Sequence, residues 1–98
     1  MRIDDIIWLP HFVDKLAWKH QVSPEEVGEV LLVGNPRYRK VQKGHNPGEN
    51  LYAAYGRTLA GRYLVVFFVY KLTREALIIS ARDMEEGEKR RLRRLTKR

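Results

Sequence analysis

Two arginines stand where the chain is expected to leave a β-strand. Arg57 follows Gly56 at the end of one predicted strand, and Arg82 closes the last one. Guanidinium groups suit a phosphate, because two parallel N–H donors match two phosphate oxygens and the positive charge stabilises a pentacoordinate phosphorane. If both arginines converge with Lys19 or His20, from the end of a predicted helix, these side chains would form a cationic pocket for a phosphate.

The sequence leaves the roles of these residues open. Neighbouring antiparallel strands run in opposite directions, so the pattern does not decide whether Arg57 and Arg82 meet. Each arginine could instead be a surface or salt-bridging residue. His20 lies on the apolar side of its predicted helix, so it could equally be a core or helix-capping residue.

A second group of polar side chains lies in the loop at residues 44–50. His45 and Glu49 bring an imidazole and a carboxylate close together, which could serve acid–base chemistry on a ribose hydroxyl, although a plain polar hairpin loop is the alternative. Aromatic side chains could stack on nucleic-acid bases or belong to the core, and the residues concerned are Trp18, Tyr52, Tyr55 and Tyr63.

Several familiar kinds of site are excluded by the sequence. It contains no glycine-rich phosphate loop and no serine in a nucleophile elbow. The three histidines, His11, His20 and His45, lack metal-ligand spacing with acidic neighbours on a shared helix face. We therefore expect neither a metal site nor a cofactor.

The charge of the chain points to a polyanionic partner. The formal net charge is +7 and the pI is near 10. Seven basic residues near the C-terminus account for the whole excess: Lys89, Arg90, Arg91, Arg93, Arg94, Lys97 and Arg98. This tail could contact RNA or an acidic partner, or it could be a solvated helix end.

The length predicts a single domain over residues 1–98. The chain has no cysteine, which excludes disulfides and thiolate metal sites and permits a reducing compartment. The N-terminus shows no signal-peptide pattern, and the longest apolar run is far too short to span a membrane. We expect a cytoplasmic protein.

Residues 63–70 form the stretch around which the other elements must pack. They carry no charge, and both alternating sets of side chains are apolar, which predicts a central strand buried on both faces. Further strands are predicted at residues 2–9, 37–43, 51–58 and 75–82. The stretch at 37–43 is rich in charge and is therefore expected at an edge.

Helices are predicted at three places. Residues 11–20 place apolar side chains on one helical face. Ser23, Pro24 and Glu26 predict a capped helix start, and the stretch from Gly34 to Pro36 predicts its end. Asp83 is expected to cap a last helix from about Met84. The fold class is α+β: a small antiparallel sheet with two N-terminal helices packed on one face and a basic C-terminal helix.

Several short motifs, in this order, resemble the BrnT family of type II toxins. They are KHQV at 19–22 followed by SPEE at 23–26, then GRT at 56–58, GR at 61–62, ISAR at 79–82 and EKRR at 88–91. Trp8 also stands twelve residues before His20, where chains similar to BrnT often carry a tryptophan. The resemblance implies a fold similar to the RelE ribonuclease toxins. It also implies a metal-independent endoribonuclease that cleaves mRNA and inhibits translation.

The same resemblance implies a cognate DNA-binding antitoxin that holds the toxin inactive, and an oligomer formed through that antitoxin. It carries over His20, Arg57 and Arg82 as catalytic residues, and Lys19, Arg90 and Arg91 as RNA contacts. Arg57 and Arg82 would hold the phosphate, while His20 would orient a group or move a proton.

The chain departs from the family pattern where apolar residues replace polar ones. Leu9, Phe12 and Leu16 stand where an aspartate, a lysine and an asparagine are usual, and Leu51 stands where an arginine is usual. Leu92 replaces an aromatic residue of the last helix. We expect the polar-to-apolar changes to lie near the site.

Two other functions are compatible with the sequence. A catalytically inactive relative could bind RNA or a protein through the basic tail, with an affinity that falls steeply with salt. A module that only holds a protein partner could use Trp18 and an exposed sheet face.

Overall fold

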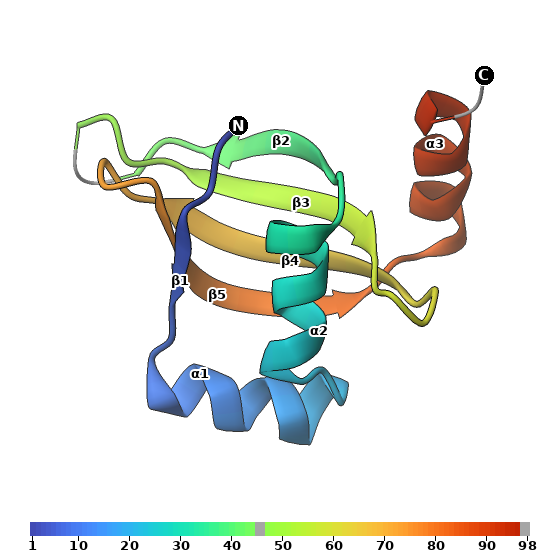
Figure 1. The fold of residues 1–98 in the computed structure, drawn as a ribbon, viewed down its shortest axis with the longest axis horizontal. Helices are drawn as coiled ribbons and strands as arrows, with labels where there is room; N and C mark the ends of the chain where they lie inside the picture. Colours follow the sequence, from blue (N-terminus) through green and yellow to red (C-terminus); the bar gives the residue numbers. More distant parts are fainter. Residues whose placement is uncertain (45–46, 97–98) are drawn as a thin grey trace.

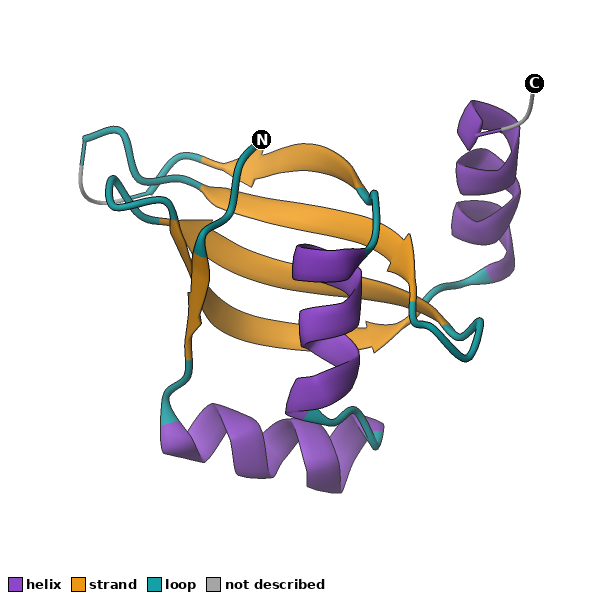
Figure 2. Ribbon diagram, in the orientation of Figure 1, coloured by secondary structure: helices purple, strands orange, loops and turns teal. Residues whose placement is uncertain are grey.

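The protein is described here by a computed structural model, which covers residues 1–44 and 47–96. In this part of the chain five strands form one sheet in the order β1-β5-β4-β3-β2, and their bounds are β1 (Asp5–Ile7), β2 (Arg37–Gln42), β3 (Leu51–Arg57), β4 (Tyr63–Tyr70) and β5 (Glu75–Asp83). Helices α1 (Pro10–Lys15) and α2 (Pro24–Gly28) lie together, whereas α3 (Glu86–Thr96) stands apart, beyond the arrowheads of β3 and β5 (Figures 1 and 2). The predicted α+β fold class is confirmed.

Strand β1 differs from the prediction in length and direction. Only Asp5–Ile7 pair, because Leu9 already caps α1 and Pro10 opens it. β1 runs parallel to β5, whereas β2, β3, β4 and β5 pair antiparallel as expected. Short hairpins enforce antiparallel pairing, but no hairpin joins β1 to β5, because all the other strands lie between them in the sequence. The parallel direction is therefore allowed, and the sheet is mixed.

Strand β4 is the central strand that the sequence predicts. Leu64, Val66 and Phe68 point into one buried cluster, and Val65 points into another on the opposite side of the sheet. The charged strand β2 is at an edge, also as predicted.

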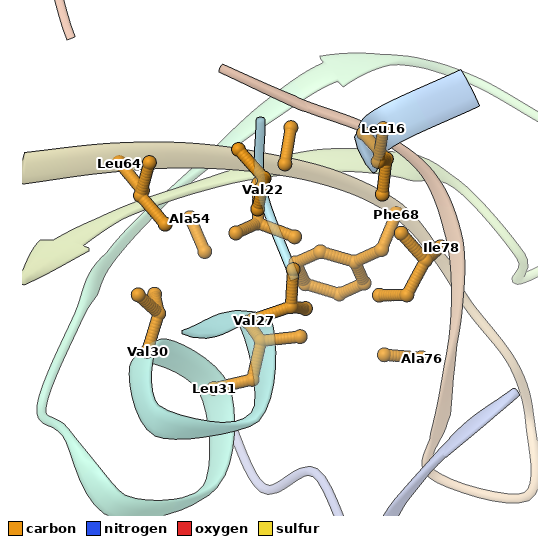
Figure 3. Close-up of a cluster of buried hydrophobic side chains, with 12 residues drawn as sticks. Leu16, Val22, Val27, Val30, Leu31, Ala54, Leu64, Phe68, Ala76 and Ile78 are labelled. Atoms are coloured by element: carbon orange, nitrogen blue, oxygen red, sulfur yellow. The ribbon is translucent and has the colours of Figure 1, made fainter. Parts of the chain in front are cut away.

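The first cluster lies beneath the N-terminal helices. α1 continues into the π-helical segment η1 (Leu16–His20), and α2 continues into a second one, η2 (Glu29–Val33). Figure 3 shows Leu16 and Val27 beside Phe68 of β4, and Val30 farther along the same cluster, on the side of Ala54. We call this side of the sheet the helix-bearing face.

The start of α2 forms as its sequence predicts. The Ser23 hydroxyl accepts a hydrogen bond from the Glu26 N–H at 3.2 Å, and the Glu26 carboxylate accepts one from the Ser23 N–H at 3.1 Å. Gly34 caps the end of η2. Trp18 is 83% exposed, in agreement with its position off the apolar side of its helix.

Helix α3 begins later than predicted. It starts at Glu86, and Asp83 does not cap it, because Asp83 ends β5 and binds Arg62. The Glu88 carboxylate instead accepts a hydrogen bond from the Glu85 N–H at 2.8 Å. Leu92 of α3 is buried with Val65 on the side of the sheet away from α1 and α2, which we call the open face. Leu95 of the same helix is 55% exposed.

Candidate functional site

Arg57 and Arg82 lie on the same face of the sheet. In the strand register Arg57 is opposite Tyr63, and Val65 is opposite both Tyr55 and Arg82. Residues 55 and 57 share one side of β3, and residues 63 and 65 share one side of β4. Both arginines therefore point to the open face, with β4 between them and a Cα separation of about 12 Å from sheet geometry.

A β-bulge directs Arg82 to this face. Ile78 and Ala76 point into the core of the helix-bearing face, so strict alternation would send Arg82 there as well. Phe67 pairs with Ser80 and Phe68 with Ile78, which leaves Ile79 as an extra residue in β5. The extra residue reverses the alternation, so that Ala81 enters the core and Arg82 faces the opposite side.

Arg57 belongs to a cluster of cations around one aromatic ring. Its guanidinium carbon lies 4.7 Å from the centroid of the Tyr63 ring, and its Nε donates to the Gly61 carbonyl at 3.4 Å. Gly61 has a φ of +94°, a conformation that favours glycine. Two side chains of α3 approach the same ring, because Lys89 Nζ and the Arg93 guanidinium carbon each lie 5.8 Å from its centroid.

The charges of this cluster are only partly balanced. Lys89 pairs with Glu86 at 3.4 Å, but no ion pair within residues 1–44 and 47–96 involves Arg57 or Arg93. Like charges that converge without counterions are costly, and an anion would relieve that cost. Arg57, Arg93 and Tyr63 border a hollow of about 500 Å³, which we call the Arg57 hollow.

Arg82 is occupied by a carboxylate. Its two terminal nitrogens donate to the two oxygens of Glu88 at 2.8 and 2.9 Å, and one of them also donates to the Asp83 carbonyl at 3.0 Å. Hydrogen bonds from Arg82 hold the pKa of the Glu88 carboxyl below its usual value, against the opposing effect of burial. A phosphate that reaches Arg82 must therefore compete with Glu88.

Lys19 and His20 end η1 on the helix-bearing side of the sheet. His20 belongs to a different network there, because Arg62 Nη2 donates to its carbonyl at 3.1 Å. Arg62 Nη1 donates to the carbonyl of Gln21 at 2.8 Å, which helps to hold this residue in a left-handed conformation with a φ of 55°. The structure thus brings Arg57 and Arg82 to one face and attaches the Lys19–His20 turn to the other.

Arg62 is the centre of that second network, a role that the sequence pattern did not predict. It donates to both oxygens of Asp83 at 2.7 and 3.1 Å and to both oxygens of Glu26 at 3.1 Å. Hydrogen bonds from Arg62 lower the pKa of the Asp83 carboxyl. Burial alone would raise the pKa of Glu26, but hydrogen bonds from Ser23 and Arg62 outweigh it and leave this pKa lowered too.

Glu49, in the described part of the stretch at residues 44–50, lies far from Arg57. His45 is outside the described residues, as are Lys97 and Arg98 of the basic tail. Glu49 is buried and accepts hydrogen bonds from Lys71 Nζ at 2.8 Å and from the Leu72 N–H at 3.2 Å. These bonds tie the loop before β3 to the turn after β4, at the end of β3 opposite to Arg57.

A larger groove opens between α3 and strands β2 and β3. Its volume is about 670 Å³, and Tyr55 forms part of its floor, so we call it the Tyr55 groove. Arg37 and Arg39 of β2 and the exposed Arg91 of α3 line it, whereas the exposed Arg90 does not. The sequence predicts a charge-rich edge strand at residues 37–43, and the alternate spacing of Arg37 and Arg39 was the available signal that both share a face.

Neither a metal cluster nor a membrane span is found in the described part of the chain. No three His, Asp or Glu side chains gather there in a way that could hold a metal ion. No helix there combines the length and apolar character needed to cross a bilayer.

Comparison with known proteins gives one family. The model of the ribonuclease toxin BrnT, of type II toxin–antitoxin systems, matches residues 11–88. The chain belongs to this BrnT family. No curated protein matches the sequence significantly. Membership makes the chain a ribonuclease toxin of a type II toxin–antitoxin system, with RNA as its substrate and an antitoxin as its partner.

The polar-to-apolar departures from the BrnT pattern do not line the Arg57 hollow. Leu51 begins β3 and Arg57 ends it, so their Cα atoms are about 20 Å apart. Leu16 is buried in the core of the helix-bearing face, and Leu9 caps α1. Leu92 differs from these, because it borders both the Arg57 hollow and the Tyr55 groove.

Proposed function

We propose that this BrnT-family chain cleaves mRNA without a metal ion and thereby inhibits translation, in the cytoplasm. The observation that supports this is the convergence of Arg57, Lys89 and Arg93 on the Tyr63 ring, with no carboxylate paired to Arg57 or Arg93 in the described residues. Guanidinium and ammonium groups supply the positive charge that a metal ion supplies in other nucleases.

The reaction is an internal transfer at phosphorus. The ribose 2′-oxygen forms a bond to the adjacent phosphorus, the bond from phosphorus to the 5′-oxygen breaks, and a 2′,3′-cyclic phosphate remains. The 2′-hydroxyl loses a proton, and the departing 5′-oxygen gains one. Arg57 contacts the non-bridging phosphate oxygens, where negative charge accumulates in the transition state. Arg93 and Lys89 add to the field at the same point.

Arg82 keeps its role in this proposal. It contacts the phosphate after exchanging Glu88 for it, and Arg90 and Arg91 contact the RNA beside it. The predicted roles of Lys19 and His20 are not kept at the cleaved phosphate, because both residues end η1 on the opposite face of the sheet. The His20 turn is joined through Arg62 to Asp83, the residue that follows Arg82 in β5.

The test is an RNA cleavage assay with the purified chain in the presence of EDTA. We expect cleavage that EDTA does not abolish, products that end in 2′,3′-cyclic phosphate, and growth arrest when the chain is expressed without its antitoxin. Loss of cleavage in EDTA that Mg²⁺ restores would contradict metal independence. Intact RNA in every condition, with verified folded protein, would contradict the nuclease proposal.

A second candidate function is RNA binding without cleavage. The bidentate pair between Arg82 and Glu88 favours it, because the guanidinium is then not available to a phosphate. The same assay separates the two functions, since the second predicts RNA binding with no cleavage product.

We further propose a DNA-binding antitoxin that joins the toxin in a heteromeric complex. Its test is co-purification of the chain with the product of the adjacent gene, followed by a growth assay and an operator-binding assay with that complex. Failure of the co-expressed neighbour to restore growth would contradict this proposal.

A further inference from the structure

The Tyr55 groove is a cavity separate from the Arg57 hollow. The groove lies between α3 and the strands β2 and β3, whereas the hollow lies between α3 and the end of β3. Tyr55 and Leu92 border both cavities. A strand of RNA with its phosphate at Arg57 therefore has a second cavity within reach along the same face.

The phenol ring of Tyr55 is held in place. Its hydroxyl oxygen accepts hydrogen bonds from Arg39 Nε at 3.3 Å and Arg39 Nη2 at 3.1 Å. The side chain is half-buried against Leu92 and Val65, and its remaining surface borders the cavities. A fixed and partly exposed aromatic ring is a platform on which a base can stack, whatever its sequence.

The charges of the groove suit a nucleotide. Three arginines border it, and none of them forms an ion pair in the described part of the chain: Arg37 donates to the Leu95 carbonyl at 3.1 Å, Arg39 donates to a neutral phenol, and Arg91 is exposed. Two carboxylates also border it. Glu88 is neutralised by Arg82, whereas Glu85 precedes α3 and its negative charge disfavours a phosphate on that side of the groove.

The spacing connects the two cavities. Tyr55 and Arg57 lie on the same side of β3, two residues apart, which is about 7 Å along the strand. We infer that the Tyr55 groove binds one nucleotide of the RNA substrate next to the cleaved phosphate, with its base stacked on Tyr55 and its phosphate at Arg37 and Arg39. This inference rests on the proposed ribonuclease function for its substrate, and it adds a binding subsite.

The experiment measures binding without cleavage. A fluorescent RNA octamer in which every ribose is 2′-O-methylated cannot supply the attacking hydroxyl, and fluorescence anisotropy gives its affinity. We expect Tyr55→Leu to weaken binding about tenfold, since it removes the stacking surface but keeps an apolar side chain against Leu92. Tyr55→Phe keeps the ring, so we expect its affinity to fall no more than about threefold.

A second test variant changes an arginine of the groove. Arg39→Gln should weaken binding several-fold and lower the slope of log affinity against log salt by about one. Two further variants, outside the groove, are the controls. Lys40→Gln changes the next residue of β2, which pairs with Tyr52 and faces the other side of the sheet, and Trp18→Leu removes an exposed aromatic ring elsewhere. Both should stay within about twofold of the unchanged protein.

Several results would overturn the inference. These are an absence of octamer binding by the unchanged protein, a Tyr55→Leu affinity within twofold of it, or equal losses in the two controls. Binding of an acidic peptide that depends on Tyr55, with RNA binding independent of it, would assign the groove to a protein partner instead. If the unchanged protein does not cleave unmodified RNA but binds the octamer through Tyr55, the subsite stands and the proposed nuclease activity fails.

Discussion

Arg57 and Arg62 flank the turn between β3 and β4, but their partners differ. Arg62 donates hydrogen bonds to two carboxylates and two carbonyls, and it joins the turn after η1 to the end of β5 and to the first turn of α2. Arg57 lies over the Tyr63 ring, with the Gly61 carbonyl as its hydrogen-bond acceptor. The difference teaches that an arginine in a short glycine motif can serve architecture or an external anion, and that its partners decide which.

The two faces of the sheet repeat this contrast. The helix-bearing face is covered by α1 and α2, and its core is fully apolar (Figure 3). The open face is covered in part by α3, and it exposes guanidinium groups and aromatic rings at two cavities. We assign folding stability chiefly to the first face and contact with RNA to the second.

The largest expected effect is on catalysis. Arg57→Gln should lower kcat/KM for RNA cleavage by about 10²–10³-fold, because it removes positive charge at the reacting phosphate. Its melting temperature should stay close to that of the unchanged protein, since Arg57 forms no ion pair within the described residues. Arg2→Gln, at an exposed residue near the N-terminus, is the control for charge and should keep full activity. Wild-type activity in Arg57→Gln would refute the assignment.

The next effect is on stability. Arg62→Gln should lower the free energy of unfolding by about 2 kcal/mol, because it leaves Asp83, Glu26 and two carbonyls without their charged donor. Urea denaturation measures this change, with Arg57→Gln as the matched arginine variant at the other end of the hairpin. A stability equal to that of Arg57→Gln would remove the distinction between the two arginines.

The same contrast should appear in acid. The pKa values of Asp83, Glu26 and Glu88 are lowered by folding, so the unfolded chain binds more protons than the folded one. The free energy of unfolding should therefore fall as pH falls from about 5 to about 3. Above this range the contribution of these carboxylates is fully present. Denaturation at several pH values should show a shallower fall in Arg62→Gln and an unchanged one in Arg57→Gln. Parallel curves for all three proteins would argue against the network.

The smallest effect should come from the Arg82–Glu88 pair. Glu88→Gln keeps an oxygen that can accept from the Glu85 N–H but removes the charge that occupies Arg82. The affinity for 2′-O-methylated RNA should rise about threefold to tenfold, because Arg82 becomes available and a carboxylate is removed. Weaker binding in this variant would mean that Glu88 itself contacts the RNA.

The elements of the fold were predictable where local chemistry determines them. The apolar run of β4 and the capping box at Ser23 formed as expected, because burial on both faces and a side-chain cap are readable from adjacent residues. The parallel pairing of β1 was not predictable, since no short turn joins it to β5. The start of α3 was misplaced because Asp83 is a good cap by residue type but is bound to Arg62 instead.

The candidate site was predictable only in part. Arg57 and Arg82 were predicted from the sequence as site residues. The face to which Arg82 points depends on a bulge at Ile79, which no residue pattern predicts. His20 was placed with them because its distance from the arginines along the sheet could not be read from spacing. Arg39 was overlooked because its bond to Tyr55 requires the pairing of β2 with β3.

RNA binding to the open face is the central claim, and an NMR titration tests it most directly. The backbone amides of uniformly ¹⁵N-labelled protein would be followed while 2′-O-methylated RNA is added. We predict that the largest shifts fall at Tyr55 and Arg57 of β3, Tyr63 of β4 and Arg91 and Arg93 of α3. Shifts confined to α1, α2 and the turn at Gln21, with the open face unchanged, would contradict the account.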